Sequence, residues 1–536
     1  MGGMESIPLP NLPFANNYTC IAISNYCALY LLYPDQEQIK VVRDAIKQYW
    51  QEGIVDEKIK LTSEGDFPKC YQFVLSGAPF RKGKERYETV RMRLMSTKIL
   101  QSMSHLGWKL LISSDLSRVY DQTTWIFKRT TIEEPPPRFF NIGISSSGTL
   151  QINNGTEELC SVIRHAVMQT WVGGIVSDDQ ISRSCYEIAL KGAPWCATGN
   201  SENCAAKLMV KTIIQSLANK KMLLYGNSNL KDTADTLFFQ YDAGNSNHNE
   251  KYLMLSLHGT DSLRLIPAPQ HLCDVVQRIL RHSSAFDLRK AVRLSPHCFE
   301  FKSYGNLWNT IGTEAIIART LILHIMKDML LHGYLICTGI DLSRNKSEKD
   351  VLLFRKVAPL DTNFFCLAPK KMSTLLFLNA PPEIIQAGRQ VIQESYFTPV
   401  DEFEHNNVYS VEFDGCAWQS MRYGHGIHGR VLLLWLIHTF STLGWRLVCS
   451  MNATARCDNQ NKTLTDVHSL YFMYDATMLT ENATASPETE SGAFNQASAP
   501  PLLTHTGPPS YASVKNDIEE PPPSYEEVTA NQSSCF

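Results

Sequence analysis

Long apolar runs are missing from this sequence. The longest, 431–437, is far shorter than the roughly 18 residues that a membrane-spanning helix needs. The first residues, MGGMESIPLPNLPF, also lack the basic segment and apolar run of a secretory leader. We therefore expect a cytoplasmic protein.

Charge is also scarce, since Lys, Arg, Asp and Glu make up 19% of the 536 residues and their formal sum is −3. No basic block is present that would neutralise several phosphates, so nucleic acid is not an expected partner. The 44% of hydrophobic residues is typical of a folded protein, and the length requires several domains.

Motifs of several common enzyme classes are missing as well. The sequence contains no Walker A loop, no G-x-S-x-G elbow, no H-E-x-x-H helix and no C-x-x-C pair. We predict no catalytic residues, no metal site and no cofactor. The cysteines number 15, which is odd for a disulfide framework, and without a leader we expect them to be reduced thiols.

One pattern occurs four times, at nearly equal spacing. Each copy has a glycine at its eighth place and an aromatic residue three places later. The copies are CYQFVLSGAPF at 70–80, CYEIALKGAPW at 185–195, CFEFKSYGNLW at 298–308 and VYSVEFDGCAW at 408–418. Such regularity predicts four tandem repeats of one structural unit.

The flanks of each copy indicate the fold of the unit. Apolar residues at helical spacing precede and follow it, as at Ile39, Val42 and Ile46. The second helix is expected to end at a glycine such as Gly107, which fits a helix C-cap, and two strands follow. The predicted unit is therefore β-α-β-α-β-β, an α+β fold.

The boundaries follow from these repeats and from shifts in composition. The predicted segments are a flexible N-terminus at 1–17, repeats at 18–130, 139–243, 251–367 and 371–476, a Pro-rich linker at 131–138, and a disordered tail at 480–536.

Recurrence among the repeats separates packing residues from candidate sites. Cys70, Cys185 and Cys298 occupy one strand position that Val408 fills in the fourth copy, which favours a buried small hydrophobe. The turn after the third predicted strand carries Asp or Asn in every copy, and both residues cap turns by bonding nearby backbone. These turn residues are Asp115, Asn229, Asp341 and Asn452.

Two further patterns occur in the fourth repeat alone. Gly424, Gly426 and Gly429 match G-x-G-x-x-G, but a dinucleotide site needs a tight strand-to-helix turn that is missing here. His425 and His428, with His405 and Cys416 upstream, could be drawn as a metal site. Their spacing is not that of known ligand sets, so we expect a solvated loop.

The tail contains two Pro-Pro-Ser-Tyr motifs, the second within EEPPPSYEEV. Consecutive prolines hold a polyproline II conformation that fits an aromatic groove, and the tyrosine adds a flat ring with a hydroxyl. The motifs resemble the PPxY ligands of WW domains, as in adaptors that recruit HECT-type ubiquitin ligases. The resemblance implies that the WW-binding residues are Pro508, Pro509, Tyr511, Pro522, Pro523 and Tyr525.

Gly2 with Ser6 fits the M-G-x-x-x-[ST] pattern for N-myristoylation. One acyl chain gives only marginal membrane binding, and neither a cysteine nor a basic patch lies nearby to strengthen it. Lipidation of Gly2 would add a peripheral membrane contact, and an ordinary frayed terminus is the alternative.

Together these features favour a non-enzymatic adaptor. In this hypothesis the tail recruits WW-domain proteins, such as ubiquitin ligases or trafficking factors, and the four-repeat body binds a protein client of unknown identity. One alternative is an enzyme or small-ligand binder with its site in a single repeat. A further alternative is a membrane-associated protein with myristoyl and PPxY late motifs, which resembles viral budding proteins.

Overall fold

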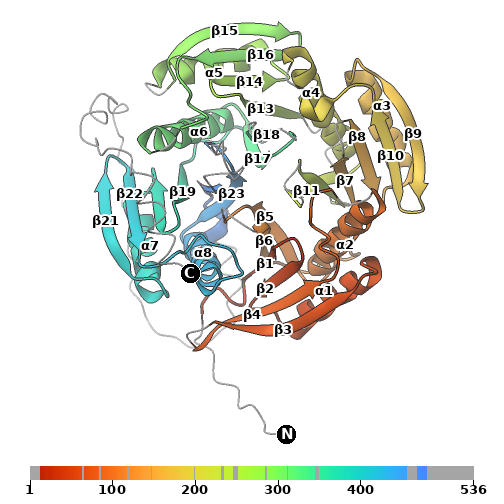
Figure 1. Ribbon diagram of the computed structural model, residues 1–536. Helices are drawn as coiled ribbons and strands as arrows, with labels where there is room; N and C mark the ends of the chain where they lie inside the picture. Colours follow the sequence, from red (N-terminus) through yellow and green to blue (C-terminus); the bar gives the residue numbers. More distant parts are fainter. Residues whose placement is uncertain are drawn as a thin grey trace.

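The computed structural model describes residues 12–479 except 63–64, 84–85, 118–120, 146–147, 198, 231–233, 245–250, 284–285, 311, 344–348 and 455–466. Four units of similar structure stand around one axis and form a ring (Figure 1). Within the described residues, no helix has both the length and the apolar character needed to cross a bilayer.

The units contain the same elements in the same order. Unit 1 comprises β1 (Tyr18–Ser24), β2 (Ala28–Leu32), α1 (Gln36–Tyr49), β3 (Ile54–Thr62), β4 (Gly65–Leu75), α2 (Arg86–His105), β5 (Trp108–Ser114) and β6 (Asp121–Arg129). Unit 2 comprises β7 (Phe139–Ser145), β8 (Thr149–Asn153), α3 (Glu157–Thr170), β9 (Ile175–Ser182), β10 (Cys185–Leu190), a short 3-10 helix (Pro194–Cys196), α4 (Asn200–Ala218), β11 (Met222–Ser228) and β12 (Thr236–Tyr241).

The second half of the ring repeats this order. Unit 3 comprises β13 (Tyr252–His258), β14 (Ser262–Ile266), α5 (Gln270–His282), β15 (Leu288–Ser295), β16 (Cys298–Ser303), α6 (Thr313–Leu331), β17 (Tyr334–Ile340) and β18 (Val351–Lys356). Unit 4 comprises β19 (Phe364–Lys370), β20 (Thr374–Leu378), α7 (Pro382–Glu394), β21 (Pro399–His405), β22 (Val408–Phe413), α8 (Gly424–Thr442), β23 (Trp445–Met451) and β24 (Ser469–Tyr474).

The six strands of each unit form one antiparallel sheet. In unit 1 the order from rim to axis is β3-β4-β2-β1-β6-β5, and the equivalent strands follow the same order in the other units. The innermost strands β5, β11, β17 and β23 therefore meet around the axis, while β3, β9, β15 and β21 form the outer rim (Figure 1).

The prediction of four α+β repeats is confirmed, but the predicted order within the unit is incomplete. Each unit is β-β-α-β-β-α-β-β, with six strands rather than four. The second strand was missed because a turn of only three residues, such as 25–27, separates it from the first in a continuous apolar stretch. The rim strand was missed because its charged, exposed residues are typical of a loop.

One predicted boundary is also wrong. Residues 364–367 were assigned to the third repeat, yet β19 pairs with β20 and β24 and belongs to the sheet of unit 4. The sequence of an apolar strand directly after a short linker does not indicate which sheet the strand will join, so the sequence alone does not assign it to a unit.

The predicted helices are present, and local chemistry explains their ends. Asp35 begins α1 with a capping box, because its side chain accepts from the Gln38 amide and the Gln38 side chain accepts from the Asp35 amide. Gly107 follows α2 with a φ of 79°, the left-handed conformation that ends many helices. Lys221 takes the same conformation after α4, without a glycine.

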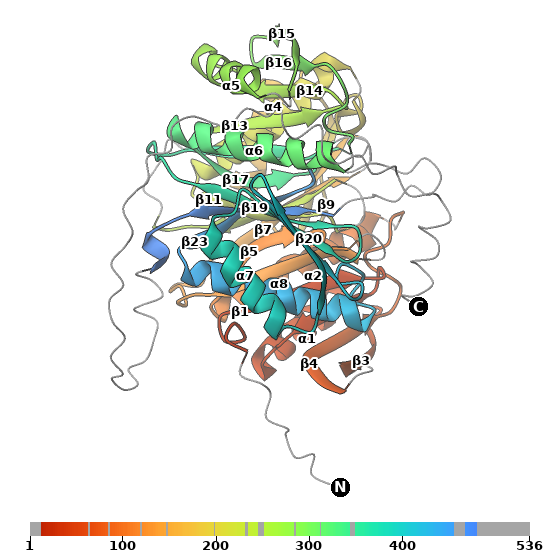
Figure 2. The same cartoon turned by 90° about the vertical axis from the view of Figure 1, so that its left-hand side faces the viewer.

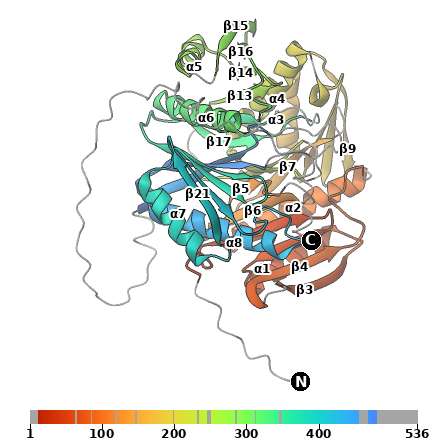
Figure 3. The same cartoon turned by 60° about the vertical axis from the view of Figure 1, so that its left-hand side comes forward.

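Packing between units closes the ring. The second helix of each unit lies between its own sheet and the sheet of the next unit: α2 contacts β7, α4 contacts β13, α6 contacts β19 and α8 contacts β1. Figures 2 and 3 show α6 in this position, with α7 and α8 next to each other below it. The four large apolar cores accordingly join residues of successive units, so each unit needs its neighbour to complete its core.

Candidate functional site

Both Pro-Pro-Ser-Tyr motifs and Gly2 lie outside the described residues. The six predicted WW-binding residues and the predicted lipidation site therefore remain predictions. Within the ring, the other predicted positions have definite places.

The recurring cysteine position is a packing position, as predicted. Cys70, Cys185 and Cys298 lie at equivalent positions of β4, β10 and β16 and are at most 1% exposed, and Val408 is partly buried. Burial raises the pKa of the Cys70 and Cys185 thiols to about 12, so neither is a nucleophile at neutral pH.

The prediction that all cysteines are reduced is wrong at Cys416, which is disulfide-bonded. The other cysteines of the described chain are free thiols. A disulfide joins cysteines that the fold brings together, and their spacing in the sequence did not reveal such a pair.

The glycines of the G-x-G-x-x-G pattern serve helix packing. Gly426 and Gly429 lie within α8, where a Cβ would overlap the carbonyl oxygens of Ser420 and Ala417. The main chain of the segment before α8 thus approaches the helix closely, which only glycine permits. This role accounts for both glycines without a phosphate.

The histidines of unit 4 do not converge on one point. His425 Nδ1 accepts from the Cys416 amide at 3.1 Å, His428 stacks on Tyr396, and His405 lies on the exposed rim strand β21. Among the described residues, no group of three or more His, Cys, Asp or Glu side chains is placed to hold a metal ion. The prediction of a solvated loop is wrong. His425 and His428 both lie within α8, where His425 is partly buried and His428 is 7% exposed, and Cys416 is buried as well.

The predicted turn caps are confirmed at two positions, and they lie at the axis. The carboxylates of Asp115 and Asp341 accept from the amides of Ser117 and Ser343 at 3.2 and 3.0 Å. Residues of these turns and of the strands beside them connect successive units. One hydrogen bond at each contact is Ser228 Oγ to Thr123 Oγ1 (3.2 Å), the Asp341 amide to Asp235 Oδ2 (2.8 Å), the Asn452 amide to Asp350 Oδ2 (2.8 Å) and the His468 amide to the Asp115 carbonyl (2.9 Å).

Two buried carboxyl groups belong to this polar axis. Burial, reinforced by the nearby Asp350, raises the pKa of Asp235 to about 7. Burial also raises the pKa of Asp350, against the opposing effect of His468. Carboxyl groups with a raised pKa can serve in acid–base catalysis. Here, however, their oxygens accept bonds from neighbouring units, so we assign them to ring closure.

A buried cation occupies the same place in every second helix. Arg93, Lys207, Arg319 and Arg430 each precede the left-handed residue after their helix by the same number of positions, and all are less than 5% exposed. We call these four residues the seam cations. Three of them bond to the next unit: Arg93 to Gln151 (2.6 Å), Arg319 to Ser469 (2.8 Å) and Arg430 to Asp121 (2.9 Å).

The sequence interpretation did not identify the seam cations, although a signal was present. A basic residue recurs at one position of the second helix in all four units, and a buried basic residue requires a hydrogen-bonding or charged partner. Alignment of the helices on their final left-handed residue would have shown it.

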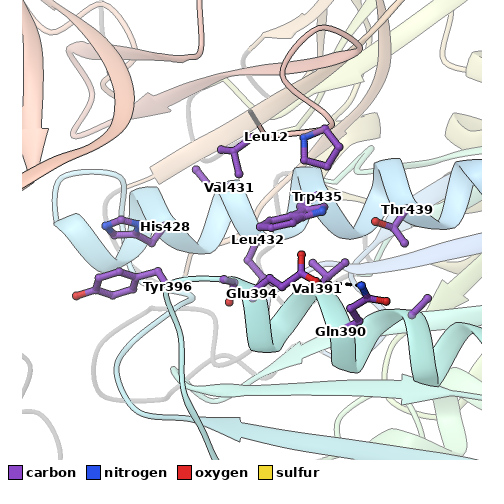
Figure 4. Close-up of a pocket in the computed structure, with 13 residues that line it drawn as sticks. Leu12, Gln390, Val391, Glu394, Tyr396, His428, Val431, Leu432, Trp435 and Thr439 are labelled. Atoms are coloured by element: carbon purple, nitrogen blue, oxygen red, sulfur yellow. Dashed lines mark hydrogen bonds between the residues drawn. The ribbon is translucent and has the colours of Figure 1, made fainter. Parts of the chain in front are cut away.

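An open groove lies in unit 4, between α7 and α8, where the described chain begins (Figure 4). Its volume is about 720 Å³, within the range of small-molecule pockets. The apolar part consists of Leu12, Ala387, Val391, Val431, Leu432 and Trp435. We call it the α7–α8 groove.

Polar groups stand along the rim of this groove. The His428 ring stacks on that of Tyr396, with centroids 3.8 Å apart and planes 9° from parallel. On the α7 side, Gln390 donates to Glu394 at 3.0 Å (Figure 4). An apolar floor with few polar groups is suited to an apolar ligand or side chain rather than to a charged one.

Comparison with known proteins gives one result that covers most of the chain. Neither the curated proteins nor the solved structures contain a match. A domain family of unknown function matches four times, over residues 17–128, 138–240, 251–355 and 363–473. These matches coincide with the four units of the ring and span well over half of the sequence. The chain therefore belongs to this family and carries four copies of its domain.

Proposed function

We propose that this protein is an adaptor whose tail recruits WW-domain proteins while the four-unit ring binds a client protein. The observation that carries the proposal is the pair of Pro-Pro-Ser-Tyr motifs in one Pro-rich and acidic tail. Two motifs on one chain engage two linked WW domains with an effective concentration in the millimolar range, which strengthens binding without any new contact. A cytoplasmic location and recruitment of a ubiquitin ligase or trafficking factor belong to the same proposal.

The closed ring supports an adaptor role because it holds the four rim strands β3, β9, β15 and β21 in fixed positions relative to one another.

The disulfide at Cys416 fits a reducing compartment poorly. Its redox state in cells is thus a direct measurement of the proposed location.

Capture of the full chain by a tandem WW-domain protein tests the proposal. Replacement of both Tyr511 and Tyr525 by alanine should abolish capture, because each ring fills the pocket that follows the proline groove. Replacement of Ser510 and Ser524 by alanine is the matched control, since these residues act as spacers. Capture that survives loss of both tyrosines would overturn the proposal.

The bivalent use of the tail has its own test. A single tyrosine replacement should weaken capture by tandem WW domains by about 10²-fold or more, while an isolated WW domain should lose only about half of its sites.

Phosphorylation of Tyr525 should weaken docking too, because it places a dianion in an apolar slot.

The α7–α8 groove supports a second candidate function, binding of a small apolar ligand in one unit. Its floor combines Trp435 with aliphatic side chains, and its volume suits such a ligand. The probe experiment described in the Discussion tests this candidate separately from the tail.

A further inference from the structure

The first helix of a unit is tied to the rim strand by an ion pair in three of the four units. These pairs are Arg43 with Glu57, Arg164 with Asp178, and Arg389 with Glu402 and Glu404. Each arginine is the eighth residue of its helix. Glu57, Asp178 and Glu402 lie opposite equivalent residues of the neighbouring strand, Phe73, Ile188 and Val411.

Unit 3 has lost both members of this pair. Gln277 is the eighth residue of α5, and Ala291 lies opposite Phe301, the equivalent of Phe73. A groove of about 670 Å³ is present at this place, and both Gln277 and Ala291 line it. Unit 3 therefore differs from the other units locally: it has an open groove where they have an ion pair.

The surroundings of this groove are basic. Arg281, Arg289 and Lys290 line it, together with one carboxylate, Asp287. All three cations are exposed, and none forms an ion pair with another part of the chain that the structure describes. We call the space lined by Gln277, Arg281, Arg289, Lys290 and Ala291 the basic groove.

The rim strand of unit 3 has an unusual charge for this molecule. β15 reads LRKAVRLS and contains three basic residues and no acidic one. The equivalent strands read IVDEKIKLT, IVSDDQIS and PVDEFEH, and each contains at least two acidic residues. Arg293 donates to the carbonyl oxygens of Ala268 and Pro296 and so has a structural role. Because all four strands occupy the same place in the sheet, packing does not require the exposed Arg289 and Lys290.

The chain itself supplies a segment of complementary charge. The second Pro-Pro-Ser-Tyr motif stands within DIEEPPPSYEE at 517–527, which has five acidic residues and no basic one. The described chain ends at Leu479, and the ~38 residues from there to Asp517 can span at most about 130 Å. A compact body of this chain length has a radius of gyration of only about 23 Å, so the tether is long enough to cross it.

We propose that the basic groove of unit 3 binds the acidic segment 517–527 of the same chain and thereby competes with WW domains for the second PPxY motif. This inference rests on the proposed function of the tail and adds its regulation. Arg281, Arg289 and Lys290 attract the acidic residues that flank the motif, and the polyproline segment lies in the space left by the lost ion pair.

The size of the effect follows from tethering. An attached segment has an effective concentration of about 1 mM, so a contact with a dissociation constant of about 0.1 mM would be occupied about nine-tenths of the time. The apparent affinity for a WW domain falls by the fraction of open molecules, here about tenfold. Salt should release the tail, since exposed charges are screened.

The test compares the affinity of a single WW domain for the full chain with that for a synthetic peptide of the tail, with Tyr511 replaced by alanine in both so that only the second motif binds. At low salt the full chain should bind about tenfold more weakly than the peptide. The double variant Arg289→Glu with Lys290→Glu should bind the WW domain as tightly as the peptide does. Arg281→Glu should recover part of the lost affinity. Equal affinity of the wild-type chain and the peptide would overturn the proposal.

A matched control exists within the repeats. Lys47 is the exposed residue of α1 at the position that Arg281 occupies in α5. Lys47→Glu changes the overall charge as Arg281→Glu does, so it should leave the affinity at the wild-type value. If Lys47→Glu releases the tail equally, the effect is one of net charge and the basic groove is not the site.

A second variant restores the lost contact. Gln277→Arg with Ala291→Glu recreates the ion pair of the other three units and fills the groove, so it too should raise WW affinity to that of the peptide. If this double variant fails to fold, the charge reversals at the exposed Arg289 and Lys290 still test the proposal.

One readout does not depend on WW binding. Carbodiimide treatment of the full chain should join the Lys290 amine to a carboxylate within 517–527, and high salt should abolish that link. If no WW domain binds the peptide or the chain, the adaptor proposal fails, while this cross-link still decides whether the groove holds the tail. Absence of the link at low salt would overturn the inference.

Discussion

At the residue scale, the main feature of this structure is the burial of charged side chains at the contacts between units. Arg430 and Asp121 form an ion pair in which both side chains are 1% exposed, and Ser420 and the Met421 amide donate to the same carboxylate. A buried pair contributes little net stability when both charges must be desolvated, but loss of one partner leaves an uncompensated charge. Its value here is to fix how unit 4 meets unit 1.

The axis carboxylate Asp235 should make stability depend on pH. Its pKa of about 7 in the folded chain is above the ordinary value of 3.8, so its contribution is complete below pH 3.8 and is lost as pH rises through 7. Asp235→Asn removes the charge and keeps an acceptor for the Asp341 amide. The variant should therefore be more stable than the wild type at pH 8, by up to about 4 kcal/mol, with no gain at pH 4.

Urea unfolding at pH 4, 6 and 8 measures this difference. Asp361→Asn is the control, because that side chain is 74% exposed and its replacement should shift all three values equally. An Asp235→Asn variant that is less stable than the wild type at pH 8 would contradict the assignment.

At this scale the sequence was informative where recurrence could be compared. It identified the buried cysteine position and the turns capped by Asp115 and Asp341, because each recurs with a simple local role. It did not reveal that those turns meet at an axis or that Asp235 and Asp350 lie close to each other. These contacts join residues far apart in the sequence, and no local pattern encodes them.

Helices and strands differ in how clearly the sequence marked them. The helices have apolar residues at regular spacing and defined ends, so all eight appear in the predicted places. The rim strands have one exposed face and an unpaired edge, and their charges protect that edge from pairing with another chain. Such a strand resembles a loop in composition, which explains why four of them were missed.

At the scale of helices and strands, we expect the α7–α8 groove to bind an apolar fluorescent probe. Ala387→Trp places a large ring in the groove and should reduce probe binding about tenfold or more, since one well-placed apolar contact of about 1.4 kcal/mol accounts for that factor. Titration of the full chain with the probe, followed by the emission of the probe itself, gives the affinity. The lining residues are those shown in Figure 4.

Gln386→Trp provides the comparison for this experiment. Gln386 is the exposed residue next to Ala387 on α7 and does not line the groove. It adds the same ring to the same helix, so probe binding should stay at the wild-type value. Equal loss in both variants would place the probe elsewhere.

At the scale of the whole molecule, the shared cores predict that the ring unfolds as one body. Asp121→Ala leaves Arg430 buried without its carboxylate and should lower the free energy of unfolding by about 3–5 kcal/mol. Hydrogen exchange should accelerate not only in α8 but also in β13, which lies in unit 3. Loss of protection confined to α8 and β1 would show that the units unfold separately.

A surface substitution serves as the reference for this experiment. Lys58 and Asp56 form an exposed ion pair on β3, and such pairs contribute at most about 1 kcal/mol. Lys58→Ala should therefore leave exchange in β13 unchanged, which separates the ring contact from a general effect of lost charge.

The seam cations have a consequence for how the ring assembles. Repeats of one design can pair in the wrong order, or with the equivalent unit of another molecule, as the chain leaves the unfolded state. Here the cation is nearly constant while its partner changes from an amide at Gln151 to a hydroxyl at Ser469 and a carboxylate at Asp121. The cations of α2, α6 and α8 thus each meet their partner on one sheet alone. Domain-swapped and out-of-order rings are penalised at the very contacts that make the four units alike.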